Sequence, residues 1–522
     1  MPGLQRLHLT LLVLGALFFA LSANYTALWF DEAYSVGIAA HPFGEIWTIG
    51  AADVHPVLYY WMLHCVYLLF GHNVVAFRLV SALGGWLLAL LGYTHVRRDF
   101  GARCGFAFTL LVFLVPWSVR IALQIRMYSW VALAVMVAVV YGWRIAVRLG
   151  QAADKSPSSG PVPLAWWAAL ALSSLAAAYL HYYGAIAAFC VQCVVLVAVL
   201  RNRSQRNRGL RRWFLFAVAA VLAYLPWLFV VVGQAKTVSG GFWIAFEFPG
   251  TFAELALFPF NTPETMKLLG HEVGGIGTTE ISLALWLLLL GCVVACAYAY
   301  GRALPNSVSF EKNGRKLGPV AYCLVVYLGT ALVAGIASFV IHQPILFFRY
   351  LAAAVGPLLL VMAFVLTRIK QKAIMAVSAV ALVVVGAVNY CTLEISAHDP
   401  TNDEGLAAYG VVCESAIRAN GGGETLAFSD SEGTASIVAE CAEGLPIIYT
   451  DPAEKYRAFE PRFVIDSAWE QLLDGYRGQA IFIGAEETAA AFADRFGGEV
   501  LRSEGYFHPY SSNWLIYSVI EF

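Results

Sequence analysis

Long apolar runs separated by short polar linkers dominate the first 393 residues of the chain. Each run is close to the roughly 20 residues that an α-helix needs to cross about 30 Å of hydrocarbon. The runs occupy residues 7–28, 77–96, 104–119, 127–147, 163–180, 184–200, 212–232, 281–301, 319–341, 346–367 and 373–393. This pattern predicts a polytopic α-helical membrane protein with about 11 spans and a first span that is retained.

The polar linkers between these runs alternate in charge. Every second linker is basic, and together these linkers hold more than half of the 33 Lys and Arg residues. They carry Arg97, Arg98 and Arg103; Arg144, Arg148 and Lys155; Arg201, Arg203, Arg206, Arg208, Arg211 and Arg212; Arg302, Lys312, Arg315 and Lys316; and Arg368, Lys370 and Lys372. Basic linkers stay in the cytoplasm. We therefore expect a cytoplasmic N-terminus, with the intervening linkers and the C-terminus outside.

One apolar stretch, Pro56–Phe70, does not fit this alternation as a span. Its roughly 15 residues would form a helix only about 22 Å long. If it crossed the membrane, every later basic linker would face outward. We expect an interfacial or re-entrant helix that has Pro56 in its first turn, where the missing N–H does no harm. Asp53 and His55 then lie before a helix N-terminus, an end that attracts phosphate.

The hydropathy changes after residue 393, where short apolar runs alternate with helical stretches. Candidate strands are Thr425–Phe428, Pro446–Tyr449, Ala480–Gly484 and the terminal Trp514–Ile520. Strands that alternate with helices are typical of an α/β domain with a mainly parallel sheet. The chain is thus divided into a transmembrane domain, 1–393, and an extracytoplasmic α/β domain, 394–522.

Composition agrees with the membrane assignment and excludes some functions. Hydrophobic residues make up 60% of the 522 residues and charged residues 13%, whereas soluble domains are about 45–50% apolar and 25% charged. The net charge of −1 gives no basic field for nucleic acid. Cys190 and Cys193 form a C-x-x-C inside an apolar run, where packing is favoured over redox or zinc chemistry. Cys413 and Cys441 lie in the polar C-terminal region, and a disulfide between them is not favoured.

The linker after the first run places carboxylates beside aromatic residues at the membrane edge. It contains Asp31 and Glu32 within Trp29–Tyr34, and Asp53 follows about 20 residues later. Ionised groups at a membrane boundary are functional candidates by default. Structural alternatives remain open: Asp31 can cap a short helix, and Arg126 and Arg349 can snorkel from the ends of spans.

The order of several short motifs along the chain is more specific than any one residue. These motifs are Phe30-Asp31-Glu32-Ala33-Tyr34, Asp53-x-His55-Pro56-x-Leu58-Tyr59-Tyr60, Gly71, Arg78-Leu79-x-Ser81, Arg126-Met127-Tyr128, His181-Tyr182-Tyr183-Gly184 and Arg349-Tyr350. In this order they resemble glycosyltransferase family 39 and its relatives in the C-type glycosyltransferase superfamily. That superfamily includes protein O-mannosyltransferases and the aminoarabinose transferases that modify lipid A. The resemblance covers residues 5–370 and is strongest in the first 190.

This resemblance implies an inverting transferase in the plasma membrane. The enzyme would move a sugar from a polyprenyl-phosphate donor to a hydroxyl of a protein, lipid or glycan acceptor on the extracytoplasmic face. Asp31 would be the base, with Glu32 and Asp53 as further catalytic residues. The residues implied to bind the donor are His55, Arg126, Tyr128, His181, Tyr182, Arg349 and Tyr350.

The chain departs from the family pattern at two positions, and a second function class remains open. Gln124 stands where bacterial relatives often have Glu, and Val57 stands where they often have Pro. The first departure removes a candidate metal ligand, so a divalent cofactor stays undecided. The alternative function is a transporter or flippase of lipid-linked sugars. Transporters place ionisable residues at the bilayer midplane, often within internal repeats. Here the acidic residues lie in linkers, the interiors of the predicted spans are almost uncharged, and the sequence shows no repeat.

Overall fold

The computed structural model describes residues 2–24, 28–153, 161–239, 318–369, 372–397, 426–430, 446–451, 453–508 and 513–522, with isolated positions at 244, 251, 255, 258, 260, 435 and 438. All structural statements below concern these residues. The chain forms two compact units. Unit 1 comprises residues 1–23, 54–59 and 78–390, and unit 2 comprises residues 24–53, 60–77 and 391–522. The sequence-based domain boundary at 393/394 stays a prediction.

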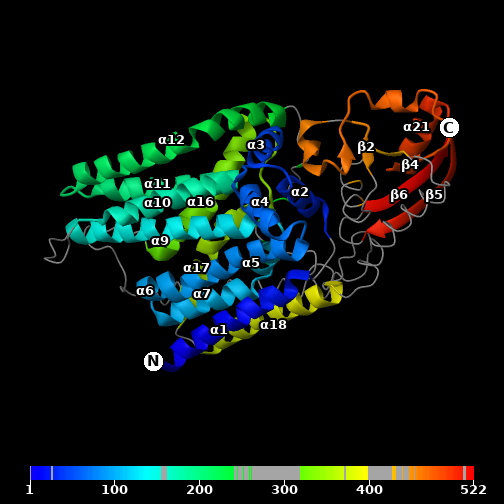
Figure 1. Ribbon diagram of the computed structural model, residues 1–522. Helices are drawn as coiled ribbons and strands as arrows, with labels where there is room; N and C mark the ends of the chain where they lie inside the picture. The colour runs from blue at the N-terminus through cyan, green and yellow to red at the C-terminus, as the bar shows by residue number, and fades with distance from the viewer. Residues whose placement is uncertain are drawn as a thin grey trace. The chain divides into compact units, whose positions relative to one another are not determined.

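Unit 1 is built from helices. In chain order the helices with residues in unit 1 are α1 (Pro2–Leu21), α4 (Leu58–Phe70), α5 (Val74–Leu91), α6 (Arg97–Phe100), α7 (Ala102–Leu114), α8 (Pro116–Leu123), α9 (Tyr128–Ala153), α10 (Leu164–Leu180), α11 (Tyr182–Arg201), α12 (Arg206–Ser239), α16 (Pro319–Val340), α17 (Val355–Leu366) and α18 (Lys372–Ala397). A π-helical turn, η2 (Gly92–Val96), joins α5 to α6, and a 3₁₀ segment, η3 (Phe348–Ala354), leads into α17. Helices α9 to α12 run side by side in Figure 1.

Seven of the described helical stretches are long and apolar enough to cross a membrane. They are Gly3–Leu21, Val74–Phe100, Tyr128–Gly150, Tyr182–Arg201, Arg206–Ala235, Pro319–Val340 and Phe348–Leu366. A bent pair of helices adds an eighth if it counts as one span. The prediction of a multi-span membrane protein is therefore confirmed, whereas the number eleven stays a prediction. The predicted span at 281–301 lies outside the described residues.

The bent pair lies where we predicted one span, at residues 104–119. Helices α7 and α8 meet at 65°, and Val115 between them has an extended backbone with φ −75° and ψ 121°. The cause is local, because the ring of Pro116 clashes with a helical conformation of the preceding residue. Pro116 itself starts α8, where its fixed φ and missing N–H are tolerated. After the break, α8 contacts η3, where the rings of Trp117 and Phe348 lie 5.8 Å apart.

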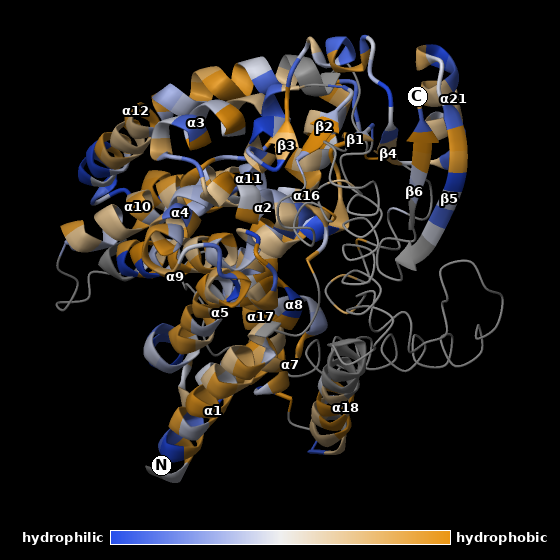
Figure 2. Cartoon of the chain, turned by 45° about the vertical axis from the view of Figure 1, so that its right-hand side comes forward, coloured by the Kyte–Doolittle hydropathy of each residue, from blue (hydrophilic) through white to orange (hydrophobic). Residues whose placement is uncertain are grey.

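Figure 2 shows that hydrophobic residues predominate on the helices of unit 1. Large apolar side chains remain exposed there, among them Leu17, Leu222, Phe229 and Phe339, which are 54%, 61%, 72% and 84% accessible. Apolar patches of this extent are unusual on the surface of a soluble monomer. In a membrane protein they are the surface that faces the lipid.

Unit 2 contains two short helices in the linker that follows the first span. These helices are α2 (Phe30–Ala39) and α3 (Phe43–Ala52). The sequence analysis allowed a short helix capped by Asp31 and did not predict α3. Asp31 was a candidate cap, but Trp29 is the N-cap of α2 and Asp31 is the second helical residue. Likewise, α4 starts at Leu58, so Pro56 precedes the helix instead of lying in its first turn.

The C-terminal part of unit 2 contains a six-stranded sheet. Its strands are β1 (Ala427–Ser429), β2 (Ile447–Tyr449), β3 (Phe463–Val464), β4 (Gln479–Ile483), β5 (Glu499–His508) and β6 (Asn513–Glu521), in the order β3-β2-β1-β4-β6-β5. Strands β1 to β4 pair in parallel, with Phe428 opposite Ile448 and Phe482. Strand β6 is antiparallel to both β4 and β5.

The sheet is therefore mixed: strands β1 to β4 are parallel to one another, as predicted, and β6 and β5 add an antiparallel edge that was not predicted. The sequence analysis recognised β6 but missed β5, whose polar residues Arg502, Ser503 and Glu504 hide the strand pattern. Only four residues separate β5 from β6, and so short a connection permits antiparallel pairing alone, because parallel strands need a long crossover. Helix α21 (Glu486–Phe496) covers one face and ends at Gly497, whose φ of +75° suits glycine. Phe492 of α21 packs against Phe428, Trp469 and Phe482 in an aromatic core.

We predict that α4 does not cross the membrane. Its 13 residues give a helix of only about 20 Å. Cysteines introduced at Val54 and Asn73, on either side of α4, should both react with a membrane-impermeant thiol reagent added from outside. The unmodified chain gives the background, and a cysteine at Arg98, in a linker predicted to be cytoplasmic, should stay unlabelled. Labelling at only one of the two flanking positions would contradict the prediction.

Candidate functional site

Unit 1 brings together five of the seven residues that the sequence analysis assigned to donor binding. His55 precedes α4, Arg126 lies in the turn between α8 and α9, and Tyr128 is the first residue of α9. His181 joins α10 to α11, and Tyr350 belongs to η3. Ring centroids of His55, Tyr128 and Tyr350 lie 6.0, 5.6 and 5.0 Å from that of His181. We refer to these five residues as the His181 cluster.

Arg126 supplies the positive charge of the cluster. Its side chain is only 2% exposed, and its Nη2 atom donates a hydrogen bond of 3.1 Å to Nε2 of His55. A guanidinium group has donors only, so Nε2 of His55 is the acceptor in this hydrogen bond. The ring proton of His55 is then on Nδ1. A buried guanidinium of this kind is suited to charge-assisted hydrogen bonds with carboxylate or phosphate oxygens.

His181 is held in one tautomer by the start of α11. Its backbone is extended, with φ −164° and ψ 144°, and its Nδ1 accepts a hydrogen bond of 3.1 Å from the backbone N–H of Tyr183. A neutral His181 therefore presents Nε2–H as a donor. Burial lowers the pKa of His181 well below its usual range, and the nearby His55 and Arg126 lower this pKa further. The cluster thus combines one permanent cation with a neutral imidazole.

The two tyrosines that follow His181 have different surroundings. Tyr182 was assigned to the donor pocket, and its hydroxyl is hydrogen-bonded to Gln234 and Trp227 of α12. Tyr183, which the sequence analysis did not select, is buried against the His181 cluster, with its ring 5.3 Å from that of Tyr350. Its hydroxyl donates to the carbonyl oxygen of Ile345 at 2.6 Å. Tyr183 therefore ties α11 to the segment that leads into η3.

Gly184 explains why the turn at His181 can be so tight. A Cβ atom at this position would collide with the carbonyl oxygen of Ala177 and with Val131. Only glycine lets α11 approach α9 and α10 this closely. The glycine of the His-Tyr-Tyr-Gly motif thus has a packing role that sets the position of His181.

Arg349, the seventh predicted donor residue, precedes Tyr350 on η3. Its guanidinium carbon lies 5.3 Å from the centre of the Phe347 ring, and its side chain is half-buried. Stacking on an aromatic face is a common arrangement for arginine. Whether Arg349 and Arg126 bind the same phosphate stays a prediction.

The three predicted catalytic carboxylates belong to unit 2. Asp31 and Glu32 lie in the first turn of α2, and Asp53 follows the last residue of α3. Glu32 is fully buried, whereas Asp31 and Asp53 are half-buried. Two adjacent helical residues point about 100° apart because the helix has 3.6 residues per turn. Asp31 is consequently the more accessible carboxylate of the pair.

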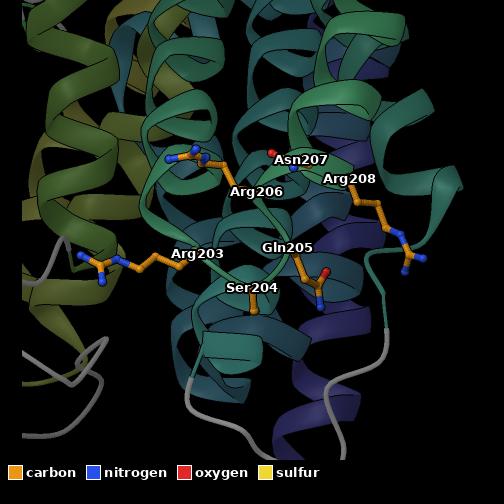
Figure 3. A pocket seen from close by; sticks show the side chains of 6 residues that line it. All are labelled: Arg203, Ser204, Gln205, Arg206, Asn207 and Arg208. Carbon is orange, nitrogen blue, oxygen red and sulfur yellow. The ribbon is translucent and has the colours of Figure 1, made fainter.

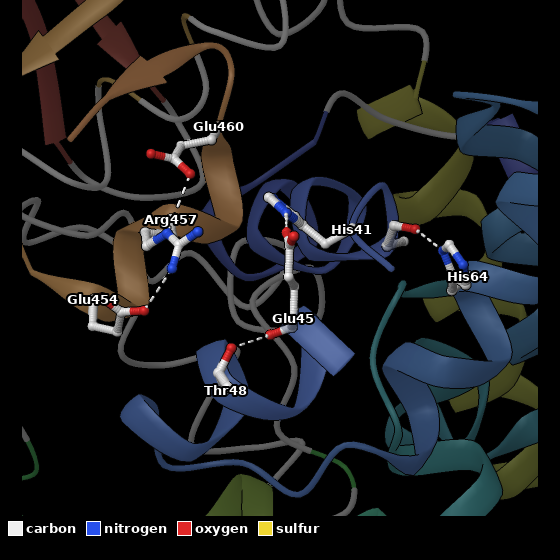
Figure 4. Close-up of polar contacts among 8 residues, drawn as sticks. His41, Glu45, Thr48, His64, Glu454, Arg457 and Glu460 are labelled. Atoms are coloured by element: carbon white, nitrogen blue, oxygen red, sulfur yellow. Dashed lines mark hydrogen bonds and ion pairs between the residues drawn. The ribbon is translucent and has the colours of Figure 1, made fainter. Parts of the chain in front are cut away.

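Hydrogen bonds and ring contacts hold the helices that carry these carboxylates. Nδ1 of His41 pairs with Glu45 at 3.0 Å, and His64 of α4 contacts the carbonyl oxygen of Ala39 at 2.9 Å (Figure 4). The ring of Tyr34 on α2 lies 5.7 Å from that of Phe459, which ends the 3₁₀ segment η4 (Glu454–Phe459). In the same segment Arg457 bridges Glu454 and Glu460 (Figure 4). The contact between Tyr34 and Phe459 thus holds α2 against η4, and α3 also packs on η4.

The described residues do not form a metal site. No three His, Cys, Asp or Glu side chains among them lie close enough to hold an ion. Gln124, at the position where relatives often carry Glu, is 2% exposed and its Oε1 has no hydrogen-bond partner within the described part of the chain. A neutral amide oxygen alone is a weak ligand for a divalent ion.

The low pKa of His181 predicts a stability change at acidic pH. In the folded protein His181 stays neutral, whereas in the unfolded chain it is protonated below about pH 6.5. The unfolded state then binds more protons, so stability is full above pH 6.5 and falls as the pH decreases. We expect His181→Gln to flatten this fall, by at most about 2 kcal/mol at pH 5. Thermal midpoints measured between pH 5 and 8 test this expectation.

The control for this experiment is His342→Asn, which removes an exposed histidine with φ +56°. Asparagine tolerates that left-handed backbone conformation. The control should keep the pH dependence of the parent chain. If the thermal midpoint depends on pH equally in the parent chain and in His181→Gln, the fall in stability at acidic pH does not come from His181.

The fold defines a class: a multi-span helical membrane protein with a C-terminal mixed-sheet domain. The chain is similar over nearly its full length to ArnT from Cupriavidus metallidurans. The apo crystal structure of ArnT matches with a TM-score of 0.49 and 15% identity, over 98% of this chain and 97% of that chain. The structure of ArnT bound to undecaprenyl phosphate matches over the same shares with a TM-score of 0.44 and 15% identity. No protein-family model and no curated protein sequence matches the chain.

Proposed function

We propose that this protein is a membrane glycosyltransferase. It moves a sugar from a polyprenyl-phosphate donor to a hydroxyl group on the extracytoplasmic face of the plasma membrane, with inversion at the anomeric carbon. The observation that carries the proposal is the His181 cluster, in which Arg126 is buried beside two histidines and two tyrosines. These residues come from four separate motifs, and the order of those motifs resembles that of family 39.

The reaction requires one base and one anion-binding group. As the acceptor oxygen attacks the anomeric carbon, its proton passes to a carboxylate, and the bond between that carbon and the phosphate oxygen breaks. The polyprenyl phosphate leaves with the electron pair. We assign the base to Asp31, because it is the accessible carboxylate at the start of α2 and because the first-loop Asp has this role in the resembling family.

The leaving phosphate needs positive charge and N–H donors, which stabilise the charge that develops on it. We assign the charge to Arg126 and a neutral donor to Nε2–H of His181. His55 acts as a positioning residue, since its Nε2 accepts from Nη2 of Arg126 and thereby orients the guanidinium fork. Tyr128 and Tyr350 provide the aromatic walls, and Tyr183 fixes the position of Tyr350.

Arg349 is expected to share the donor phosphate with Arg126. Both residues belong to unit 1, and Arg349 directly precedes Tyr350 of the His181 cluster. Arg349→Ala should raise the KM for the donor, lower kcat, or change both, because a charge-assisted contact to the phosphate is lost. Arg368→Ala is a suitable control, since Arg368 lies in a linker predicted to be cytoplasmic, where its side chain stacks on the ring of Phe364 from α17. Normal kinetics for Arg349→Ala would remove Arg349 from the site.

A transporter of lipid-linked sugars is the alternative function. It predicts movement of intact donor across the membrane without cleavage. The decisive assay incubates the purified chain with a labelled polyprenyl-phosphate sugar and measures released polyprenyl phosphate. Release that depends on both the protein and an acceptor supports the transferase. Movement of donor between the leaflets of a vesicle without release supports the transporter.

A further inference from the structure

A strongly basic segment lies at the turn between α11 and α12. Residues 201–212 contain six arginines and no acidic residue. Five of these arginines are exposed: Arg201, Arg203, Arg206, Arg208 and Arg211. The proposed transferase reaction does not use them. We refer to residues 201–212 as the arginine turn.

Hydrogen bonds of the neutral residues hold the backbone of the arginine turn. Asn202 is buried, and its side chain accepts from the hydroxyl of Ser204 at 3.0 Å and from the backbone N–H of Gln205 at 2.8 Å. The sixth arginine, Arg212, donates to the carbonyl oxygen of Val162 at 2.6 Å. Within the described part of the chain, the five exposed arginines form no ion pair. Their charges are thus presented on a fixed turn and are available to an external anion.

The arginines surround a wide hollow and do not converge on one point. The hollow has a volume of about 870 Å³ and is lined by residues 203–208. Arg203 and Arg206 extend to one side of the turn, whereas Arg208 extends to the other (Figure 3). A single small anion could not contact all three guanidinium groups. A broad anionic surface with several phosphates could.

The helix that begins in the arginine turn continues as an exposed apolar surface. Arg208 and Arg211 are followed at helical spacing by Leu215, Leu222 and Phe229, which are 62%, 61% and 72% exposed. Residues three, four and seven apart lie on one face of a helix. One face of α12 therefore presents basic side chains at its end and apolar side chains along its length. A phospholipid has the same order of charge and hydrocarbon.

We propose that the arginine turn and the adjoining face of α12 form a binding site for anionic phospholipid. The lipid phosphates contact Arg203, Arg206 and Arg208, and acyl chains lie along Leu215, Leu222 and Phe229. Clusters of arginine next to a transmembrane helix bind anionic headgroups electrostatically. The positive-inside rule alone accounts for basic residues in this linker, but it does not require that the protein prefer one lipid over another. That preference is the testable content of the proposal.

The experiment measures the thermal midpoint of the full chain in mixed micelles with increasing mole fractions of phosphatidylglycerol or phosphatidylcholine. We expect phosphatidylglycerol to raise the midpoint and phosphatidylcholine to have little effect. Arg206→Gln/Arg208→Gln should shift the phosphatidylglycerol titration about 25-fold to higher lipid, because each of these two guanidinium groups contacts a lipid phosphate at the proposed site and such a contact strengthens binding about fivefold. Added salt should weaken the effect in the same direction.

The matched control is Arg98→Gln/Arg103→Gln, which removes two exposed arginines from another basic linker. It should titrate like the parent chain. An equal shift in both double variants would overturn the proposal, because net charge alone would then explain the response. Stabilisation by phosphatidylcholine to the same extent would also overturn it. Inorganic phosphate is the third arm, and full stabilisation by millimolar phosphate would show a site for a free anion instead of a lipid.

Discussion

Asp31→Asn should lower kcat by about 10² to 10⁴ while donor binding survives. This range is the usual contribution of general base catalysis, and the amide keeps the size of the carboxylate but cannot take a proton. A purely structural role would have a much smaller effect. Asp31 is the second residue of α2 and not its cap, so loss of its charge at the helix N-terminus costs only about 0.3–1 kcal/mol.

The measurement is a comparison of kcat, donor KM and thermal midpoint for the parent chain, Asp31→Asn and Asp53→Asn. Asp53 follows the last residue of α3 and is also half-buried, so its variant tests the other accessible carboxylate of the same linker as a candidate for the base. We expect kcat to fall most in Asp31→Asn, at a nearly unchanged midpoint. A folded Asp31→Asn protein with normal turnover would transfer the role of base to Asp53 or to Glu32.

Arg126→Ala should reduce kcat/KM for the donor by about 10² to 10³, the range seen when one stabilising donor is removed from an anionic transition state. Arg126 is buried and donates to His55, so the variant also leaves the His55 acceptor without this donor, at a cost of about 1–3 kcal/mol of stability. Both losses have the same origin, because the same guanidinium binds His55 and is assigned to the phosphate.

A second variant separates these two effects. Arg126→Lys keeps the positive charge but loses the planar fork that matches two phosphate oxygens. We expect it to restore part of the donor affinity, whereas His55→Ala should leave the charge in place and cause a smaller loss. Steady-state kinetics with a labelled donor, together with thermal midpoints, distinguish the contributions. Unchanged kcat/KM in a folded Arg126→Ala protein would exclude Arg126 from donor binding.

The sequence by itself determined the membrane class, the positions of the long apolar helices and the charge of their linkers. These properties depend on residues that are close in the chain, since about 20 consecutive apolar residues suffice to define a span. The same is true of the strands β1, β2, β4 and β6, each of which lies at an apolar run. The motifs at Arg126 and His181 were also visible, because their residues are adjacent in sequence.

The tertiary structure alone decided which side chains meet. The sequence analysis selected Tyr182 and not Tyr183 for the donor pocket. Their side chains point about 100° apart, and it is Tyr183 that faces Tyr350, whereas Tyr182 faces α12. Glu32 and Asp31 are adjacent carboxylates, and only packing made one buried and the other accessible. Strand β5 was found only through its pairing with β6. In each case the deciding interaction joins residues that are distant in sequence, or it depends on the direction in which a side chain points, which the local sequence pattern does not specify.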